Sequence, residues 1–228
     1  MLKLTPILLA VLYGIAVYGF SAFRTKRELD AKSTELLDPS LTPVLQRLAS
    51  ALDVPKVKVS IYQIDPVNGL AAPDGRIFIT RGFYQKFRQG EVSAEELASV
   101  IAHELGHVAL GHTRRRLIDF SGQNALRTAL AVFLNRFLPG LGAMVAGLLT
   151  SLLAARMSRD DEFEADAYAS ALLTKSGIGT EAQKSLFRKL DALTKSQAGS
   201  APAWLLSHPK THERIKAIEA LEARWSRA

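Results

Sequence analysis

Apolar residues recur at helical spacing through most of this chain and at strand spacing in two short segments. Residues 56–64 alternate between polar and apolar side chains, and the apolar residues 76–80 follow a turn-rich stretch; both patterns are typical of β-strands. A helix is predicted from Ser93 to about Gly111, because Ser93 and Glu96 match a capping box and buried-type residues then recur every three or four positions. The pattern predicts a mostly helical α+β fold with a small sheet.

Further helices are expected in the C-terminal half. One begins at Ser158, where polar residues follow an apolar stretch, and ends near Gly177, a residue suited to a helix C-terminus. Another begins near Thr180, and the last covers residues 211–225. Residues 24–52 are polar and contain two prolines, so they are interpreted as a partly helical linker.

The first apolar segment lies at the N-terminus. Residues 4–23 carry no charge, and about 20 such residues are enough for one helical bilayer crossing. A transmembrane helix is predicted here; a cleaved signal sequence is the alternative, disfavoured because no A-x-A-like site follows. Three basic residues at 24–27 against Lys3 alone slightly favour a cytoplasmic over a periplasmic catalytic domain, at a bacterial inner membrane. The predicted organisation is an anchor (1–23), a linker (24–52) and a catalytic domain (53–228).

A second apolar segment, residues 117–157, lies inside the predicted catalytic domain. Two interpretations remain open: a hairpin that dips into or spans the membrane, or a hydrophobic hairpin packed on the domain or lying at the membrane surface. Arg127, Arg136 and the Pro139-Gly140 break favour the second.

Composition narrows the possible chemistry. The 228 residues include no cysteine, which excludes disulfides, thiolate metal ligands and a catalytic thiol. The formal net charge of +7 suits attraction to anionic lipid. No nucleic-acid recognition motif accompanies the scattered basic residues, so we expect no nucleic acid as a partner.

The predicted helix at 93–111 carries the sequence His103-Glu104-Leu105-Gly106-His107. Residues four apart lie on one face of a helix, so His103 and His107 can place two imidazole nitrogens on one ion. Glu104 lies about 100° around the helix axis, beside that ion, where a carboxylate can take a proton from a zinc-activated water. This arrangement is typical of zinc hydrolases.

The third ligand distinguishes the classes of such enzymes. The metzincin pattern requires glycine and histidine where this chain has Leu110 and Thr113, so it does not apply. A glutamate from a second helix is the other option, and Glu162 can supply it. Asp166 lies four residues later on the same face, where it can accept a hydrogen bond from a ligand histidine and fix its tautomer.

Three motifs occur in order: His103–His107, then Glu162-Phe163-Glu164-Ala165-Asp166, then Ser207-His208-Pro209 with Arg214 downstream. Together they resemble the HtpX-like and CAAX-prenyl-protease-like metallopeptidases, a membrane-associated gluzincin family, over roughly residues 60 to 220. The resemblance implies a gluzincin domain, one Zn²⁺ per chain held by His103, His107 and Glu162, and Asp166 behind a ligand. It also implies that His208 and Arg214 line the cleft and stabilise the oxyanion or hold the substrate.

The family's cleft also suggests a substrate site. If the predicted strand at 76–80 has an exposed edge, then Ile77, Phe78 and Ile79 can pair with an extended peptide. The resemblance implies polypeptide substrates, unfolded or membrane proteins above all, in membrane-protein quality control; too few apolar segments are present for prenyl-peptide processing.

The predicted function is therefore that of a zinc-dependent endopeptidase with Glu104 as general base. The alternative is a non-catalytic membrane protein with a structural zinc site or a chaperone-like binding role, which Glu104 disfavours because a structural site needs no base. Sequence reasoning does not assign the oligomeric state.

Overall fold

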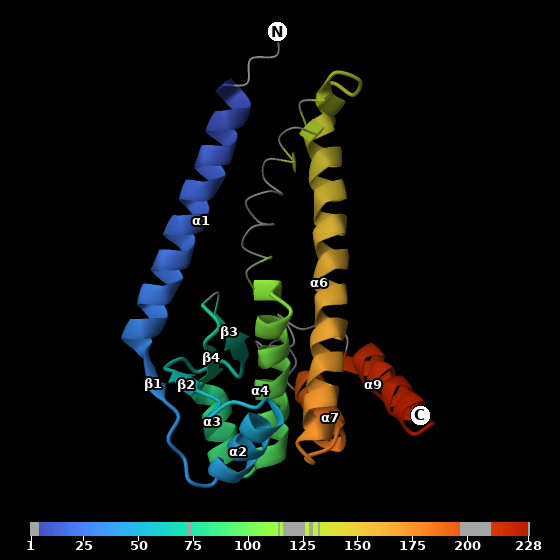
Figure 1. The fold of residues 1–228 in the computed structure, drawn as a ribbon. Helices are drawn as coiled ribbons and strands as arrows, with labels where there is room; N and C mark the ends of the chain where they lie inside the picture. The colour runs from blue at the N-terminus through green and yellow to red at the C-terminus, as the bar shows by residue number, and fades with distance from the viewer. Residues whose placement is uncertain are drawn as a thin grey trace. The chain divides into compact units, whose positions relative to one another are not determined.

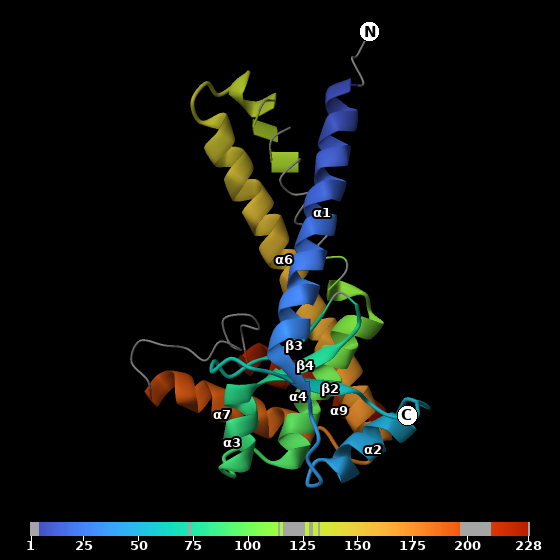
Figure 2. The ribbon, with the colours of Figure 1, turned by 90° about the vertical axis from the view of Figure 1, so that its left-hand side faces the viewer.

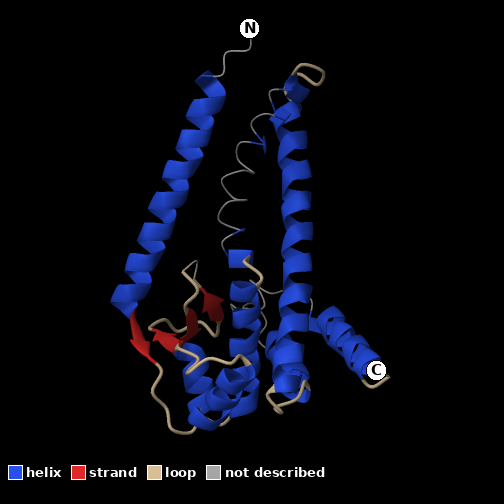
Figure 3. Ribbon diagram, viewed as in Figure 1, coloured by secondary structure: helices blue, strands red, loops and turns tan. Residues whose placement is uncertain are grey.

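The computed structural model describes residues 5–72, 74–113, 115, 126, 127, 130, 131, 133–196 and 211–227. The chain divides into two compact units. Unit 1 consists of Met1–Glu28 and Gly111–Asp161, and unit 2 consists of Leu29–Leu110 and Glu162–Ala228. Helices predominate and the strands are few and short (Figure 3), so the mostly helical α+β class is confirmed.

The sheet belongs to unit 2 and has four strands in the order β1-β2-β4-β3. They are β1 (Ser33–Glu35), β2 (Val59–Tyr62), β3 (Gly69–Ala71) and β4 (Ile77–Thr80). β2 and β4 run parallel, and β1 and β3 flank them in antiparallel orientation. The two predicted strands correspond to β2 and β4. β1 lies in the segment predicted to be a linker and gave no alternation signal, since it is only three residues long.

β4 is an inner strand, and this corrects the expected substrate site. It pairs with β2 on one side and β3 on the other, and Ile77, Phe78 and Ile79 are all at most 3% exposed. An unbroken apolar run buried on both faces is characteristic of an inner strand. The prediction that these three residues offer an exposed edge to a peptide is therefore wrong, and the sheet edge on this side is formed by β3.

Within the described residues of unit 2, helices pack on the sheet and beside it. α2 (Thr42–Ala51) and α3 (Arg81–Arg88) follow β1 and β4, and the predicted helix at 93–111 is α4 (Ala94–Ala109). α4 packs on β3 and β4 (Figure 1). Its capping box is present: Ser93 accepts from the Glu96 N–H, and the Glu96 carboxylate accepts from the Ser93 N–H. Leu97, Val100 and Ile101 lie in the core that this helix shares with α2 and the sheet.

The C-terminal helices complete the unit. The part of α6 (Gly142–Lys175) after Glu162 packs against α4, and α7 (Glu181–Ser196) packs against both α4 and α9 (Thr211–Trp225), as Figure 2 shows for α7 and α4. The predicted helix start at Ser158 is wrong, because α6 continues through it. The segment from Leu148 to Lys175 contains no glycine or proline to interrupt the helix, and its charged residues are compatible with a helix interior.

Unit 1 contains the part of α1 (Thr5–Lys32) up to Glu28 and the part of α6 up to Asp161. Several large apolar side chains are exposed in this unit: Leu12, Ile15, Phe20, Phe23, Phe133, Phe137, Leu138, Leu141, Met144, Leu148 and Leu149. None of the helices, so far as their residues are described, is both long and apolar enough to cross a membrane. Much of the first arm of the predicted hairpin at 117–157 lies outside the described residues.

Candidate metal centre

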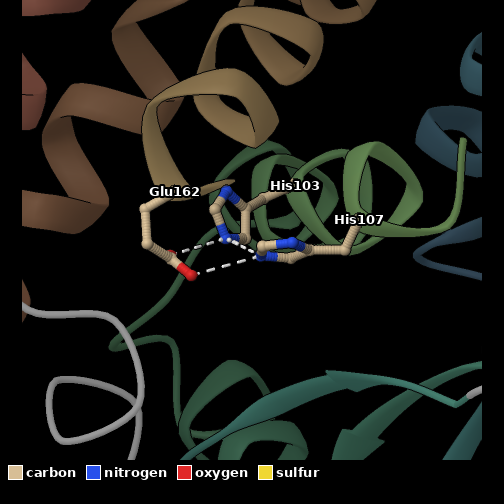
Figure 4. A group of neighbouring side chains, drawn as sticks. All are labelled: His103, His107 and Glu162. Atoms are coloured by element: carbon tan, nitrogen blue, oxygen red, sulfur yellow. Dashed lines mark hydrogen bonds and ion pairs between the residues drawn. The ribbon is translucent and has the colours of Figure 1, made fainter. Parts of the chain in front are cut away.

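Three side chains from two helices of unit 2 converge on one point (Figure 4). Nε2 of His103 lies 3.1 Å from Nε2 of His107, both on α4. On α6, Glu162 places Oε2 3.3 Å from Nε2 of His103 and Oε1 3.5 Å from Nε2 of His107. All three side chains are buried, at 2–3% exposure. The structure thus brings together the histidines of one helical turn and a carboxylate that is distant in the sequence.

These separations match the geometry of a tetrahedral zinc ion. Ligand atoms at about 2.0–2.1 Å from zinc lie about 3.3–3.4 Å apart along the edges of a tetrahedron. The three observed separations, 3.1, 3.3 and 3.5 Å, bracket that value. Two imidazoles and one carboxylate are also the donor set of the His₂Glu zinc enzymes, whose fourth position is left to water or substrate. The residues present therefore fit zinc.

Gly106 allows the two ligand-bearing helices to approach. A Cβ built on Gly106 would lie 3.0 Å from the carbonyl oxygen of Ala165 and 3.3 Å from Cβ of Tyr168, both on α6. A side chain here would be in tight contact with the backbone of α6, and a shift of α6 to relieve that contact would move Glu162 as well. The glycine inside the motif is therefore a packing requirement of the site.

Asp166 orients His103, as the sequence spacing predicted. Oδ1 of Asp166 lies 3.0 Å from Nδ1 of His103, and Asp166 is 1% exposed. A proton on Nδ1 that is donated to this carboxylate leaves the Nε2 lone pair directed toward the metal position. Burial by itself lowers the pKa of His103, but the carboxylates of Asp166 and Glu162 outweigh it and raise that pKa to about 9.

Arg214 lies beside Asp166, and its Nη1 is 3.7 Å from Oε2 of the ligand Glu162. It is 1% exposed and bonds Asp166 through Nε (2.5 Å to Oδ2) and Nη2 (2.7 Å to Oδ1). These bonds go to an interior carboxylate, and the expected role of Arg214 in lining the cleft stays a prediction. His208, the other residue that the family motif implied, lies outside the described residues.

Gln183 is a site residue that sequence reasoning missed. Its side-chain amide donates to Oδ1 of Asp166 (3.2 Å) and accepts from Oγ of Ser170 (2.9 Å), and it is 1% exposed. It stands near the start of α7 and belongs to no metal-ligand spacing, so its residue type and position gave no signal. Only the packing of α7 beside α6 reveals it.

Glu104 lies at the contact between α4 and the edge of the sheet. It is 2% exposed, and a Cβ added to Gly69 of β3 would meet Oε1 of Glu104 at 3.2 Å and Cγ1 of Val100 at 2.6 Å. β3 can pass this close to the helix because residue 69 has no side chain. The edge strand of the sheet therefore runs directly beside the carboxylate of the motif.

Comparison with known proteins agrees with this site. Residues 35–222 match peptidase family M48. The chain belongs to that family. It is 30% identical over 205 residues to the metalloprotease LoiP of Escherichia coli, covering 84% of this chain and 75% of LoiP. It is 26% identical over 205 residues to the metalloprotease YcaL of the same organism (90% and 77%), and 24% identical over 246 residues to the protease HtpX of Nitrosococcus oceani (92% and 80%).

This M48 protein is a metalloendopeptidase, and its metal site is the cluster of His103, His107 and Glu162. The resemblance inferred from the three sequence motifs is confirmed, and its substrates are polypeptides. Family membership also disfavours the alternative of a non-catalytic structural zinc protein.

Proposed function

We propose that this M48 peptidase holds one Zn²⁺ per chain on His103, His107 and Glu162 and that Glu104 is its general base. The observation that carries the proposal is the set of ligand separations, which matches the edges of a zinc tetrahedron. Zinc bound there supplies Lewis-acid polarisation of the scissile carbonyl and lowers the pKa of a water molecule toward neutrality.

The protein's own groups carry out the proton transfers. Glu104 takes the proton from the attacking water and then delivers it to the leaving amine, as its position next to His103 on α4 allows. Its carboxylate is almost fully buried, so bulk water is kept from competing for that proton. Asp166 keeps His103 in the tautomer whose Nε2 can bind a metal.

A Glu104→Gln variant tests the assignment. It should retain zinc, because none of the three ligands is changed, and should lose casein hydrolysis by at least about 100-fold, the lower range for general-base catalysis. Glu95→Gln is the matched control, since Glu95 lies on the same helix and is exposed. Wild-type hydrolysis should also cease with a chelator and return with added zinc.

Hydrolysis by Glu104→Gln at the wild-type rate would rule out this base. Loss of both zinc and activity would show instead that Glu104 helps to bind the metal. A wild-type protein that binds zinc but never cleaves a polypeptide would favour the structural-zinc alternative.

We further propose that an extended polypeptide binds along β3. On either side of β3, the Asn68 carbonyl accepts from the Thr80 N–H of β4, and the Ala72 N–H donates to the carbonyl of Arg76, the residue before β4. Because successive residues of an antiparallel strand alternate in direction, Gly69 and Ala71 direct their main-chain groups away from β4, toward the open edge. Main-chain hydrogen bonds to this edge would hold a substrate next to Glu104 and would not depend on the substrate's side chains. That favours unfolded polypeptides, consistent with a role in protein quality control.

Two parts of the proposal rest on the sequence. His208, assigned from the family motif, would contact the substrate near the metal. Residues 1–23 would anchor the chain to a bacterial inner membrane, followed by a linker and the peptidase domain, with the cytoplasmic side slightly favoured by the positive charges at 24–27. The exposed apolar side chains of unit 1 support contact with lipid.

A further inference from the structure

A buried guanidinium is built into the interior of the metal centre. Arg214 comes from α9, more than a hundred residues after the histidines, and is 1% exposed. Its Nε and Nη2 bond the two oxygens of Asp166 separately, at 2.5 and 2.7 Å. Its Nη1 lies 3.7 Å from Oε2 of the ligand Glu162, and its Nη2 lies 3.3 Å from Nδ1 of His103. Arg214 therefore contacts two of the three residues that hold the metal, His103 and Glu162, and also the Asp166 carboxylate behind them.

The two-point contact determines how the Asp166 carboxylate is turned. A guanidinium presents two parallel N–H bonds that match the two oxygens of a carboxylate, whereas a lysine ammonium is a point charge. Phe187 of α7 lies beneath the guanidinium, with 4.4 Å from Cζ to the ring centroid, and so restricts its tilt. Gln183 adds a third donor to Oδ1 of Asp166. The carboxylate plane is therefore held by groups from both α7 and α9.

The orientation of the Asp166 carboxylate determines the orientation of the metal ligand His103. Oδ1 of Asp166 is also the atom that faces Nδ1 of His103, at 3.0 Å. Arg214 has only donors, so it cannot accept the Nδ1 proton, and that proton is directed to Asp166. A carboxylate free to rotate would let the imidazole turn and would move Nε2 away from the other two ligands.

We propose that Arg214 is a positioning residue of the metal centre, which acts through Asp166 to hold His103 in its metal-binding orientation. Its two closest hydrogen bonds go to Asp166, so the role proposed for it is positioning rather than catalysis. Zinc affinity therefore depends on how α9 packs against α7 and α6. This inference rests on the proposed zinc site and extends it to a residue and two helices outside the ligand set.

The test is the zinc dissociation constant of the full-length chain, measured by competition with a chromophoric chelator. Arg214→Lys keeps the charge but loses the two-point contact, and should weaken zinc binding by about 10- to 100-fold, the usual effect of removing a partner behind a metal ligand. Arg224→Lys is the matched control, since Arg224 is an exposed arginine on the same helix, and should bind zinc as the wild type does.

A double-mutant cycle separates positioning from general stabilisation. If Arg214 acts through Asp166, then Arg214→Lys combined with Asp166→Asn should bind zinc no more weakly than Asp166→Asn alone. The Co²⁺-substituted Arg214→Lys protein should also show a visible absorption spectrum different from that of the wild type. If the losses of zinc affinity from the two single substitutions instead multiply in the double variant, the inference is overturned. It is also overturned if Arg214→Lys has the wild-type spectrum and the wild-type zinc affinity.

Gln183→Met provides a second variant if Arg214→Lys does not fold. It removes one donor to the same oxygen of Asp166 and keeps the side-chain length, so a smaller loss of zinc affinity is expected; unchanged affinity would count against the inference. Unaltered zinc affinity in Arg214→Lys with a large loss of kcat would overturn it in favour of an oxyanion role. A wild-type chain that takes up no zinc would instead overturn the proposed function itself.

Discussion

At the level of single residues, the metal site depends on the absence of a side chain at Gly106 as well as on the side chains that would bind the metal. Gly106 has no Cβ, and a Cβ at that position would lie only 3.0 Å from the Ala165 carbonyl oxygen of α6. The close approach of the two helices lets His103, His107 and Glu162 cluster within reach of one ion.

A Gly106→Ala substitution should therefore damage the metal site. Overpacking should cost about 1–3 kcal/mol of folding stability and weaken zinc binding, because α6 and Glu162 move away from α4. Gly19→Ala is the control: Gly19 is also helical and nothing lies within 4 Å of its added Cβ, so stability should stay the same or rise. Thermal unfolding and chelator competition measure both effects, and a Gly106→Ala protein with wild-type zinc affinity would contradict this account.

The raised pKa of His103 predicts how zinc affinity depends on pH. A histidine must be neutral to bind zinc, and in the metal-free protein the pKa of His103 is about 9, above its ordinary 6.5. Below that pKa each bound zinc displaces a proton, so the affinity should rise about tenfold per pH unit up to about pH 9. Titration calorimetry in buffers of different ionisation enthalpy measures the released proton.

Asp166→Asn supplies the control for this pH dependence. It removes one of the carboxylates that raise the pKa of His103, so the increase in affinity should end at a lower pH. A wild-type affinity that levels off near pH 6.5 would show that His103 is not perturbed in this way.

At the scale of elements, the sequence predicted α4 closely because its signals are local. The cap residues and the repeat of apolar positions lie within one helix, and the structure has the helix at Ala94–Ala109 with both capping bonds. The helix start expected at Ser158 was wrong for the opposite reason. A cluster of charges suits a helix terminus, but it also suits a helix interior when no residue interrupts the backbone hydrogen bonds.

The position of a strand within the sheet is also not local. The apolar residues Ile77, Phe78 and Ile79 predicted a strand, but only its pairing with both β2 and β3 shows that it is an inner one. β3 itself is three residues long and begins with glycine, so it carried no strand signal. That β3 ends the sheet on the side of Glu104, among the described strands, was therefore not visible in the sequence.

Binding along β3 predicts a periodic response to substrate methylation. Peptide substrates N-methylated at one position at a time should show raised KM at alternate positions, because only every second N–H faces the strand. The positions in between are the internal control, since their N–H groups point away from β3. A KM profile without this period of two would contradict pairing with the sheet edge.

At the scale of the whole molecule, the apolar side chains of unit 1 predict lipid association. The full-length chain should float with phospholipid vesicles in a density gradient, and more completely with anionic than with neutral lipid because the net charge is +7. A variant lacking residues 1–23 should bind more weakly. A full-length chain that remains entirely at the bottom of the gradient would contradict the proposed membrane association.

The chemistry of this protein could be predicted from its sequence alone. Two histidines and a glutamate within one helical turn, and a second acidic pair at the same spacing, already indicated a zinc peptidase with His103, Glu104, His107, Glu162 and Asp166. Such motifs are readable because helical periodicity converts sequence spacing directly into a shared face.

How these residues are oriented, and which strand lies beside them, depends on the tertiary fold. Gln183 and Arg214 surround Asp166 because α7 and α9 pack beside α6, and β3 adjoins Glu104 because Gly69 lets it approach α4. These contacts join residues far apart in the chain, and their energies depend on burial and orientation rather than on residue type. No local pattern encodes such a contact, so it becomes visible only when the helices and the sheet are in place.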